Sequence, residues 1–470
     1  MRSTEINSKI TCPPTRLLTK LTGLYRQFQY IYDHTTVDYP GVGVLTASNR
    51  DVWAKVTLFH SYLPHIPSLP NSLINTYLNL HPCSHTHVLS PQDQAELASN
   101  PHNASILQSI HSSAFIVCLD SAKPTDIPSF SRQLWHGGEN GVELTNRWVD
   151  KPVQVIVCDG PEARSGIMGE HSVMDGTPTA RMCDDILDML ANPSFDNGTS
   201  TSPVSSITPP QPLDFVVSSS TTTAIATAKK AAYDLTSSQA LTHFTTSYGK
   251  DTIKTFNVSP DSWAQLAVQL AYARLLRDLG KTREGGTYEA ASTRKFLKGR
   301  TEAIRVVTEE TDAWVNAMLE HDLALTPSTA TLASTEASPY SSLPEDSSSH
   351  LRTLLHTAAK RHIQLAREGG SAQGIDRHLL GLRLLVDASS GEKIPEIYSD
   401  PVYTRANRWV LSTSAVFSKH FDAYGWGEVR VSSALFSLIV HSIPPTLTDI
   451  NIAAGRPRRF RCCIYDWIQW

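Results

Sequence analysis

Several features that would assign a chain of this length to a familiar class are missing from the sequence. No apolar run reaches about 18 residues, which argues against a transmembrane helix. The formal charge of −4 over 470 residues provides no general attraction to nucleic acid or to an anionic membrane. No internal repeat or coiled-coil heptad run is evident. Any binding of an anion must therefore depend on a local group of cations.

Paired cysteines are also missing. The seven cysteines are an odd number, and they form neither a CxxC motif nor a Cys/His pattern with metal-ligand spacing. We therefore expect reduced thiols in an intracellular protein. The cytoplasm is the default compartment, and a mitochondrial or peroxisomal location stays open.

What is present is a chain long enough for two or three structural units. A stretch rich in Ser, Thr and Pro at 199–212 predicts a lobe boundary, and another at 324–349 predicts a flexible insertion between helices. Strand and helix signals both occur along the chain. The expected strands are 42–46, 114–120 and 153–157, and the expected helices are 221–236 and 262–279, the second capped by Ser259 or Asp261.

The most informative segment is GIMGEHSVMDGTP at 166–178, where His171 stands four residues before Asp175. An imidazole titrates near neutral pH, so His171 can take a proton from a thiol or hydroxyl group and return it later. Asp175 would then fix the turn and the ring, and an ion pair between Asp175 and Arg147 is our hypothesis. Taken alone, the same pattern also fits two residues that only stabilise a turn.

A local group of cations lies further along the chain. Lys250 and Lys254 are four residues apart, so on a helix or tight loop both ammonium groups could face one anionic ligand. The same spacing also fits a solvated helix face. Asp261 either contacts that ligand or caps the helix that follows it.

Longer stretches surround these residues and resemble the choline/carnitine acyltransferase family over roughly residues 43–429. They occur in the family's order. The matching segments are NRWVDKPVQVIV at 146–157, YGKDTIKTFNVSPD at 248–261, TYEAASTRKFLKGRTEAIR at 287–305, IDRHLLGLRL at 375–384 and WVLSTSAVFSKHFDAYGWGEV at 409–429.

The resemblance implies a two-lobed α/β fold, with mixed sheets flanked by helices and an active-site tunnel between the lobes. The first lobe, 41–212, would carry His171, and the second, 213–429, would carry the coenzyme A and carnitine sites. His171 would be the general base for direct acyl transfer between coenzyme A and the carnitine hydroxyl. Coenzyme A is then a co-substrate, with no permanently bound cofactor, metal or nucleic-acid partner, and we expect a monomer.

The family's motifs also imply roles for other residues. A buried carboxylate needs charge-assisted donors, and the resemblance assigns the carnitine carboxylate to Tyr288, Thr301 and Arg377. Arg377 could instead form a structural ion pair with Asp376. The remaining assignments are Ser412 to carnitine, Ser414 to the developing oxyanion, Lys250 and Lys254 to the 3′-phosphate of coenzyme A, and Asp261 to its adenosine end.

The resemblance also bears on specificity. Tyr424 falls where family members for short acyl groups have a bulky residue, so we expect acetyl or propionyl transfer. Carnitine is favoured over choline because choline would leave Arg377 and Thr301 without a carboxylate to bind. Ala415 departs from the glutamine common in the family, which puts a nearby contact in doubt.

Both ends of the chain depart from the family. Residues 1–40 lack the usual N-terminal region, and the tail at 430–470 resembles no part of the family, so we expect a chain that is truncated or altered at both ends. The alternative function is therefore a defective member or pseudoenzyme that binds coenzyme A or a partner without turnover. A metal site at His171 is the third hypothesis, and it lacks a second set of properly spaced ligands.

Overall fold

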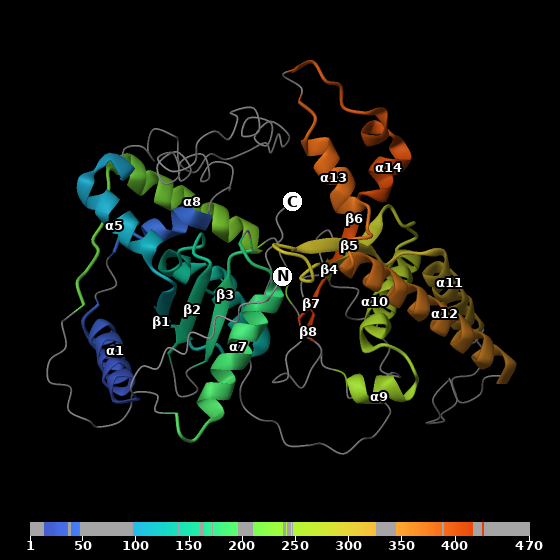
Figure 1. The fold of residues 1–470 in the computed structure, drawn as a ribbon, viewed down its shortest axis with the longest axis horizontal. Coiled ribbons are helices and arrows are strands. Elements are labelled where there is room, and N and C mark those ends of the chain that lie inside the picture. Colours follow the sequence, from blue (N-terminus) through green and yellow to red (C-terminus); the bar gives the residue numbers. More distant parts are fainter. Residues whose placement is uncertain are drawn as a thin grey trace, which may run out of the picture.

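The elements of the chain form two groups that lie side by side, each built on a small sheet (Figure 1). This arrangement comes from a computed structural model, and both sheets are mixed, with helices packed around them. The predicted α/β fold of two similar lobes is confirmed. The tunnel between the lobes stays a prediction. The structure describes residues 14–35, 39–47, 97–139, 141–159, 164–171, 173–195, 210–237, 241, 246, 248–325, 345–387, 390–416 and 425–426.

The first lobe is organised by a sheet in the order β1-β2-β3, with β1 and β2 parallel and β2 and β3 antiparallel. Its strands are β1 Ile116–Asp120, β2 Val153–Cys158 and β3 Ser165–Gly169, so the strands expected at 114–120 and 153–157 are confirmed. Alternate residues of β2 are buried, as the two-residue period of a strand requires. The side chains of Phe130 and Leu134 pack beneath the buried Ile156.

Helices cover this sheet. The first-lobe elements are α1 Pro14–His34, η1 Val42–Ala47, α5 Pro101–Ser112, α6 Ile127–His136, η2 Val142–Asn146, α7 Gly176–Ala191 and α8 Ser219–Ser237. The helix expected at 221–236 is therefore confirmed as α8. Its Ala224 and Ile225 pack against Val42 and Trp148. The first lobe thus includes α8, although α8 follows the stretch at 199–212.

The strand expected at 42–46 is wrong, because these residues form the short 3-10 helix η1. Val42, Val44 and Leu45 are all buried, and they pack in one cluster with Trp148 and residues of α8. The backbone bonds locally, with Val44 N donating to Gly41 O at 3.1 Å. A short apolar run carries no periodicity that separates the two conformations.

The second lobe is organised by a sheet in the order β5-β4-β6, in which β4 is antiparallel to β5 and parallel to β6. Its strands are β4 Gly286–Ser292, β5 Thr301–Arg305 and β6 Trp409–Thr413, and β7 Ala415–Val416 pairs with β8 Gly425–Trp426. Its helices are α9 Lys250–Thr255, α10 Pro260–Asp278, α11 Glu309–Leu325, α12 Glu345–Gly370, α13 Asp376–Leu384, η5 Glu396–Ser399 and α14 Pro401–Ala406.

Helix α10 illustrates how local signals set the elements of this lobe. The Ser259 side chain accepts a hydrogen bond from Ser262 N, and Pro260 occupies the first turn. This confirms the helix expected at 262–279 and identifies Ser259 as its cap. Helices α11 and α12 reach into both ends of the stretch at 324–349, and its middle lies outside the described residues. Within the described part of the chain, no helix combines the length and apolar character needed to span a bilayer.

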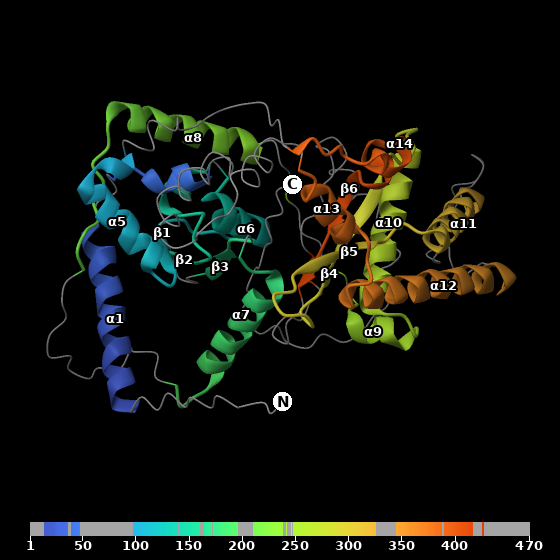
Figure 2. The same ribbon diagram turned by 45° about the horizontal axis from the view of Figure 1, so that its top comes forward.

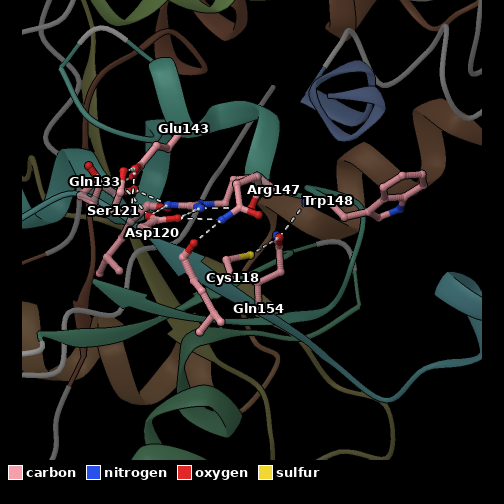
Figure 3. A network of polar contacts seen from close by, with 11 residues as sticks. Cys118, Asp120, Ser121, Gln133, Glu143, Arg147, Trp148 and Gln154 are labelled. Carbon is pink, nitrogen blue, oxygen red and sulfur yellow. Dashed lines mark hydrogen bonds and ion pairs between the residues drawn. The ribbon is translucent and has the colours of Figure 1, made fainter. Parts of the chain in front are cut away.

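A buried ion pair joins the end of strand β1 to the segment before β2 (Figure 3). Arg147 donates to both carboxylate oxygens of Asp120, at 2.8 and 2.6 Å, and neither side chain has any exposed surface. Asp120 also accepts from Gln133 at 2.6 Å and from Asn146 at 3.0 Å. Burial alone would lower the pKa of Arg147, but the hydrogen bond and charge of Asp120 raise it above its ordinary value. Arg147 and Asp120 therefore stay charged in the core of the first lobe, and their pairing holds the end of β1 against the segment before β2.

We predict that Asp120→Asn destabilises the protein by about 3–5 kcal/mol, because it leaves the buried Arg147 cation without its counter-charge. Urea denaturation followed by circular dichroism measures the change. The matched control is Asp185→Asn, which removes the exposed partner of Arg181 and should cost less than about 0.5 kcal/mol. Equal unfolding midpoints for Asp120→Asn and the wild type would contradict the prediction.

Candidate active site

His171 lies in the turn between β3, which ends at Gly169, and α7, which begins at Gly176. Its Nδ1 lies 3.0 Å from the main-chain oxygen of Met174. Because a carbonyl oxygen can only accept a hydrogen bond, this contact favours the hydrogen on Nδ1, and in the neutral ring the lone pair is then on Nε2. The side chain is 18% exposed, so it is reachable yet largely enclosed. This is an orientation suited to a general base.

Asp175 lies beside the same ring nitrogen, with its Oδ1 3.5 Å from Nδ1 of His171. The carboxylate accepts two bonds from Arg300, from Nε at 3.1 Å and from Nη2 at 2.8 Å. Arg300 Nη2 also donates to the main-chain oxygen of His171 at 2.6 Å. The predicted pairing of Asp175 with Arg147 is therefore wrong, because Arg147 is held by Asp120 in the core of the first lobe.

Arg300 reaches the first lobe from the turn between β4 and β5. Both views of the fold show this turn approaching the start of α7 (Figures 1 and 2). The turn is closed by Thr293 N, which donates to Arg300 O at 2.9 Å. A Cβ on Gly299 would lie 2.0 Å from Thr293 O, so only glycine fits this close approach. Sequence reasoning missed Arg300, although it directly precedes Thr301 in the GRTE segment.

Three polar side chains, one each from β4, β5 and α13, meet in the second lobe. Tyr288 on β4 shares a hydrogen bond with Thr301 on β5, and its hydroxyl accepts from Arg377 Nη2 at 3.2 Å. Burial raises the pKa of Tyr288 above its ordinary value, which keeps the hydroxyl protonated as a donor. The structure thus brings together the three residues predicted to form a carboxylate pocket.

Helix α13 is docked so that Arg377 faces this pocket. The Arg377 main-chain nitrogen donates to Glu302 Oε1 at 3.2 Å. Its neighbour Asp376 binds Arg305, whose Nε lies 3.2 Å from Asp376 Oδ2. Asp376 therefore anchors the helix to β5, while the Arg377 guanidinium lies 5.6 Å from the centre of the Tyr288 ring.

Strand β6 places the predicted serine pair. Ser412 is aligned with Tyr288 in the parallel register, so both lie on one face of the sheet. Thr413 points to the other face, where it is fully buried and its hydroxyl lies 3.0 Å from Tyr288 O. Ser414 follows at the strand end and, by the same alternation, belongs to the side of Ser412. Tyr424, the predicted acyl-pocket residue, lies outside the described residues.

The residues predicted for coenzyme A lie at one end of the second lobe. Lys250 and Lys254 are one turn apart on α9, and both are exposed. Asp261 lies in the first turn of α10 and is half-buried. Ser259 caps that helix, so the capping role that the sequence left open between Ser259 and Asp261 belongs to Ser259.

Comparison with known proteins places this arrangement in a family. The sequence model described as "Choline/Carnitine o-acyltransferase" matches residues 91–438, which is well over half of the chain. The chain belongs to this family. The match includes every predicted site residue from His171 to Tyr424, and it ends at residue 438, beyond the expected end of the similarity at 429.

Curated members of the choline/carnitine acyltransferase family differ in the acyl group and acceptor that their names state. The chain is 31% identical to the mitochondrial carnitine O-acetyltransferase of Saccharomyces cerevisiae, over 72% of this chain and 47% of that protein. It is 34% identical to the mitochondrial carnitine O-palmitoyltransferase 2 of Xenopus tropicalis (70% and 45%) and 30% identical to the choline O-acetyltransferase of Drosophila melanogaster (72% and 48%). The chain thus spans about half the length of the curated relatives it matches.

Proposed function

We propose that this chain transfers a short acyl group, acetyl or propionyl, between coenzyme A and the hydroxyl of carnitine. The observation that supports this most directly is the contact of His171 Nδ1 with the Met174 carbonyl, which in the neutral ring leaves the lone pair on Nε2. A base in this state can serve both directions, because it takes a proton from one substrate and gives it to the other.

In the direction that forms acylcarnitine, Nε2 of His171 takes the proton of the carnitine hydroxyl as its oxygen attacks the thioester carbonyl. A tetrahedral intermediate forms, and the Ser414 hydroxyl donates to its oxyanion. The carbon–sulfur bond then breaks, and the imidazolium returns the proton to the coenzyme A sulfur. Arg300 and Asp175 touch no reacting atom in this scheme, and they act by holding the His171 turn.

The acceptor is carnitine because the pocket at Tyr288 carries a cation. A carboxylate there would form an ion pair with the guanidinium of Arg377 and accept hydrogen bonds from the hydroxyls of Tyr288 and Thr301. Choline has no carboxylate and would leave these donors unpaired. The short acyl group is proposed on the identity of Tyr424 alone. The names of several relatives place them in mitochondria or peroxisomes, which favours an intracellular site of action here.

The first prediction is that the protein releases coenzyme A thiol from acetyl-CoA only when L-carnitine is present. His171→Ala should lower kcat by at least about 10³-fold, because no other group takes the hydroxyl proton. His350→Ala, on the exposed side of α12, is the matched control and should keep full activity. A folded wild type that binds acetyl-CoA without releasing thiol would instead support the binding-only alternative.

The second prediction concerns the acceptor. Arg377→Gln should raise the KM for carnitine by about 10- to 100-fold, since a charge-assisted contact to the carboxylate is lost, while the KM for acetyl-CoA changes by less than about twofold. Arg383→Ala tests a second arginine on the same helix and should leave both values unchanged. An equal loss for both substrates would argue against a carboxylate contact.

The third prediction concerns the 3′-phosphate. Lys250→Ala and Lys254→Ala should each raise the KM for coenzyme A about tenfold at low salt, and should leave the KM for dephospho-coenzyme A unchanged. Lys123→Ala, in the first lobe, controls for the loss of one positive charge. Equal effects on the two nucleotides would show that the lysines bind another part of the ligand.

A further inference from the structure

The sheet of the second lobe has polar residues on both of its faces, and the proposed acyl transfer involves only one of them. Tyr288 and Ser412 lie on the face of the carboxylate pocket. The strand alternation turns Glu289 and Thr413 to the opposite face, where both are buried. That face packs against α10 and α12, and Thr413 Oγ1 donates to Gln265 of α10 at 3.1 Å.

At the centre of this interior lies His362, on α12. Its Nε2 is 2.7 Å from Glu289 Oε2, and its Nδ1 is 2.9 Å from Ser262 Oγ. The Ser262 hydroxyl donates to Ala359 O at 3.5 Å, which leaves a lone pair to accept from Nδ1. The side chains of His362 and Glu289 are only 4% and 6% exposed. The partners on both nitrogens therefore favour an imidazolium that donates twice.

Charge supports the same protonation state. Burial alone would lower the pKa of His362, but the hydrogen bond and charge of Glu289, together with the charge of Asp261, raise it above its ordinary value. Burial raises the pKa of Glu289, and the nearby charge of Asp261 acts in the same direction. The polar atoms of Asp261, Glu289 and His362 all lie within 4.8 Å of one another. In the ionised form of this group, one imidazolium faces two carboxylates, with His362 Nε2 2.7 Å from Glu289 Oε2.

We propose that His362 is a positioning residue that clamps β4 to the start of α10, and so holds the coenzyme A end of the site in register with the carnitine pocket. The inference rests on the proposed function. Asp261 belongs to the segment predicted to bind coenzyme A, and Glu289 directly follows Tyr288 on β4. The His362 ring lies between these two places, in contact with Glu289 on β4 and Ser262 on α10.

The clamp has a defined response to pH. A histidine whose pKa is raised by folding contributes stability that is fully present below its ordinary value of 6.5 and is lost as the pH rises through the raised pKa. Above that pKa the two carboxylates face a neutral ring. Substrate affinity should therefore weaken for both substrates together on the alkaline side.

Stability measurements test the clamp without any need for turnover. At pH 7, His362→Gln should lower Tm by about 5–10 °C, because Glu289 keeps a buried charge without its partner. The double variant His362→Gln with Glu289→Gln should recover at least about half of this loss, since it buries no unpaired charge. The Tm difference between wild type and His362→Gln should shrink as the pH rises from 7 to 9.

His136→Gln provides the matched control. His136 is also a buried histidine, but burial lowers its pKa to about 4, so it is neutral throughout this pH range. Any Tm change in that variant should stay constant between pH 7 and 9. A His362→Gln variant whose Tm difference is equally constant, or a double variant no more stable than His362→Gln, would overturn the charged clamp.

Kinetics then separate positioning from a purely structural role. His362→Gln should raise the KM for acetyl-CoA and for carnitine about tenfold each, and the double variant should return both toward the wild type. A side chain that only stabilised the fold would lower the active fraction, and hence kcat, with both KM values unchanged. That result would overturn the proposal.

The metal content and the activity of the wild type complete the test. One zinc ion per chain in the purified protein, absent from His362→Gln, would make the three residues a metal site and overturn the clamp. An inactive wild type would contradict the proposed acyl transfer alone, because the Tm series still decides whether His362 is charged, and calorimetric titration with coenzyme A then replaces the KM comparison.

Discussion

Strand β4 imposes the constraint on which the second lobe depends. It pairs with β5 on one side and β6 on the other, so its backbone is held in register along both edges. A strand held in this way must send successive side chains to opposite faces. Tyr288 therefore reaches Arg377 because Thr287 and Glu289 are bound behind the sheet, the first by Gln269 at 3.0 Å and the second by His362.

The β4–β5 hairpin also links the two lobes. The hairpin that pairs β4 with β5 also carries Arg300, whose guanidinium binds the Asp175 carboxylate and the His171 carbonyl. Arg300 is 44% exposed, and an ion pair with that exposure adds little to stability in water. Its contribution is geometric, because the planar guanidinium holds two acceptors of the His171 turn at once. The orientation of the His171 turn thus depends on a residue of the other lobe.

Charge is handled differently in the two interiors. In the first lobe, Arg147 and Asp120 form a fully buried pair that also satisfies neighbouring polar groups, and no substrate role is assigned to it. In the second lobe, the buried pair is His362 with Glu289, and Glu289 raises the pKa of His362 above its ordinary value through its hydrogen bond and charge. The cation of the first pair is an arginine, which stays protonated in proteins, whereas the cation of the second is a histidine, which can titrate.

The sequence by itself determined the elements whose signals are local. Ser259 and Pro260 start α10, the apolar runs at 114–120 and 153–157 form strands, and long motifs place His171, Tyr288, Thr301 and Arg377 in one family. Only the tertiary structure decided which charges meet, because Asp175 and Arg300 are separated by 125 residues and no spacing rule connects them. It also decided that Arg147 serves the core, and that the apolar run at 42–46 forms a 3-10 helix, since the packing of a short apolar run depends on neighbours far along the chain.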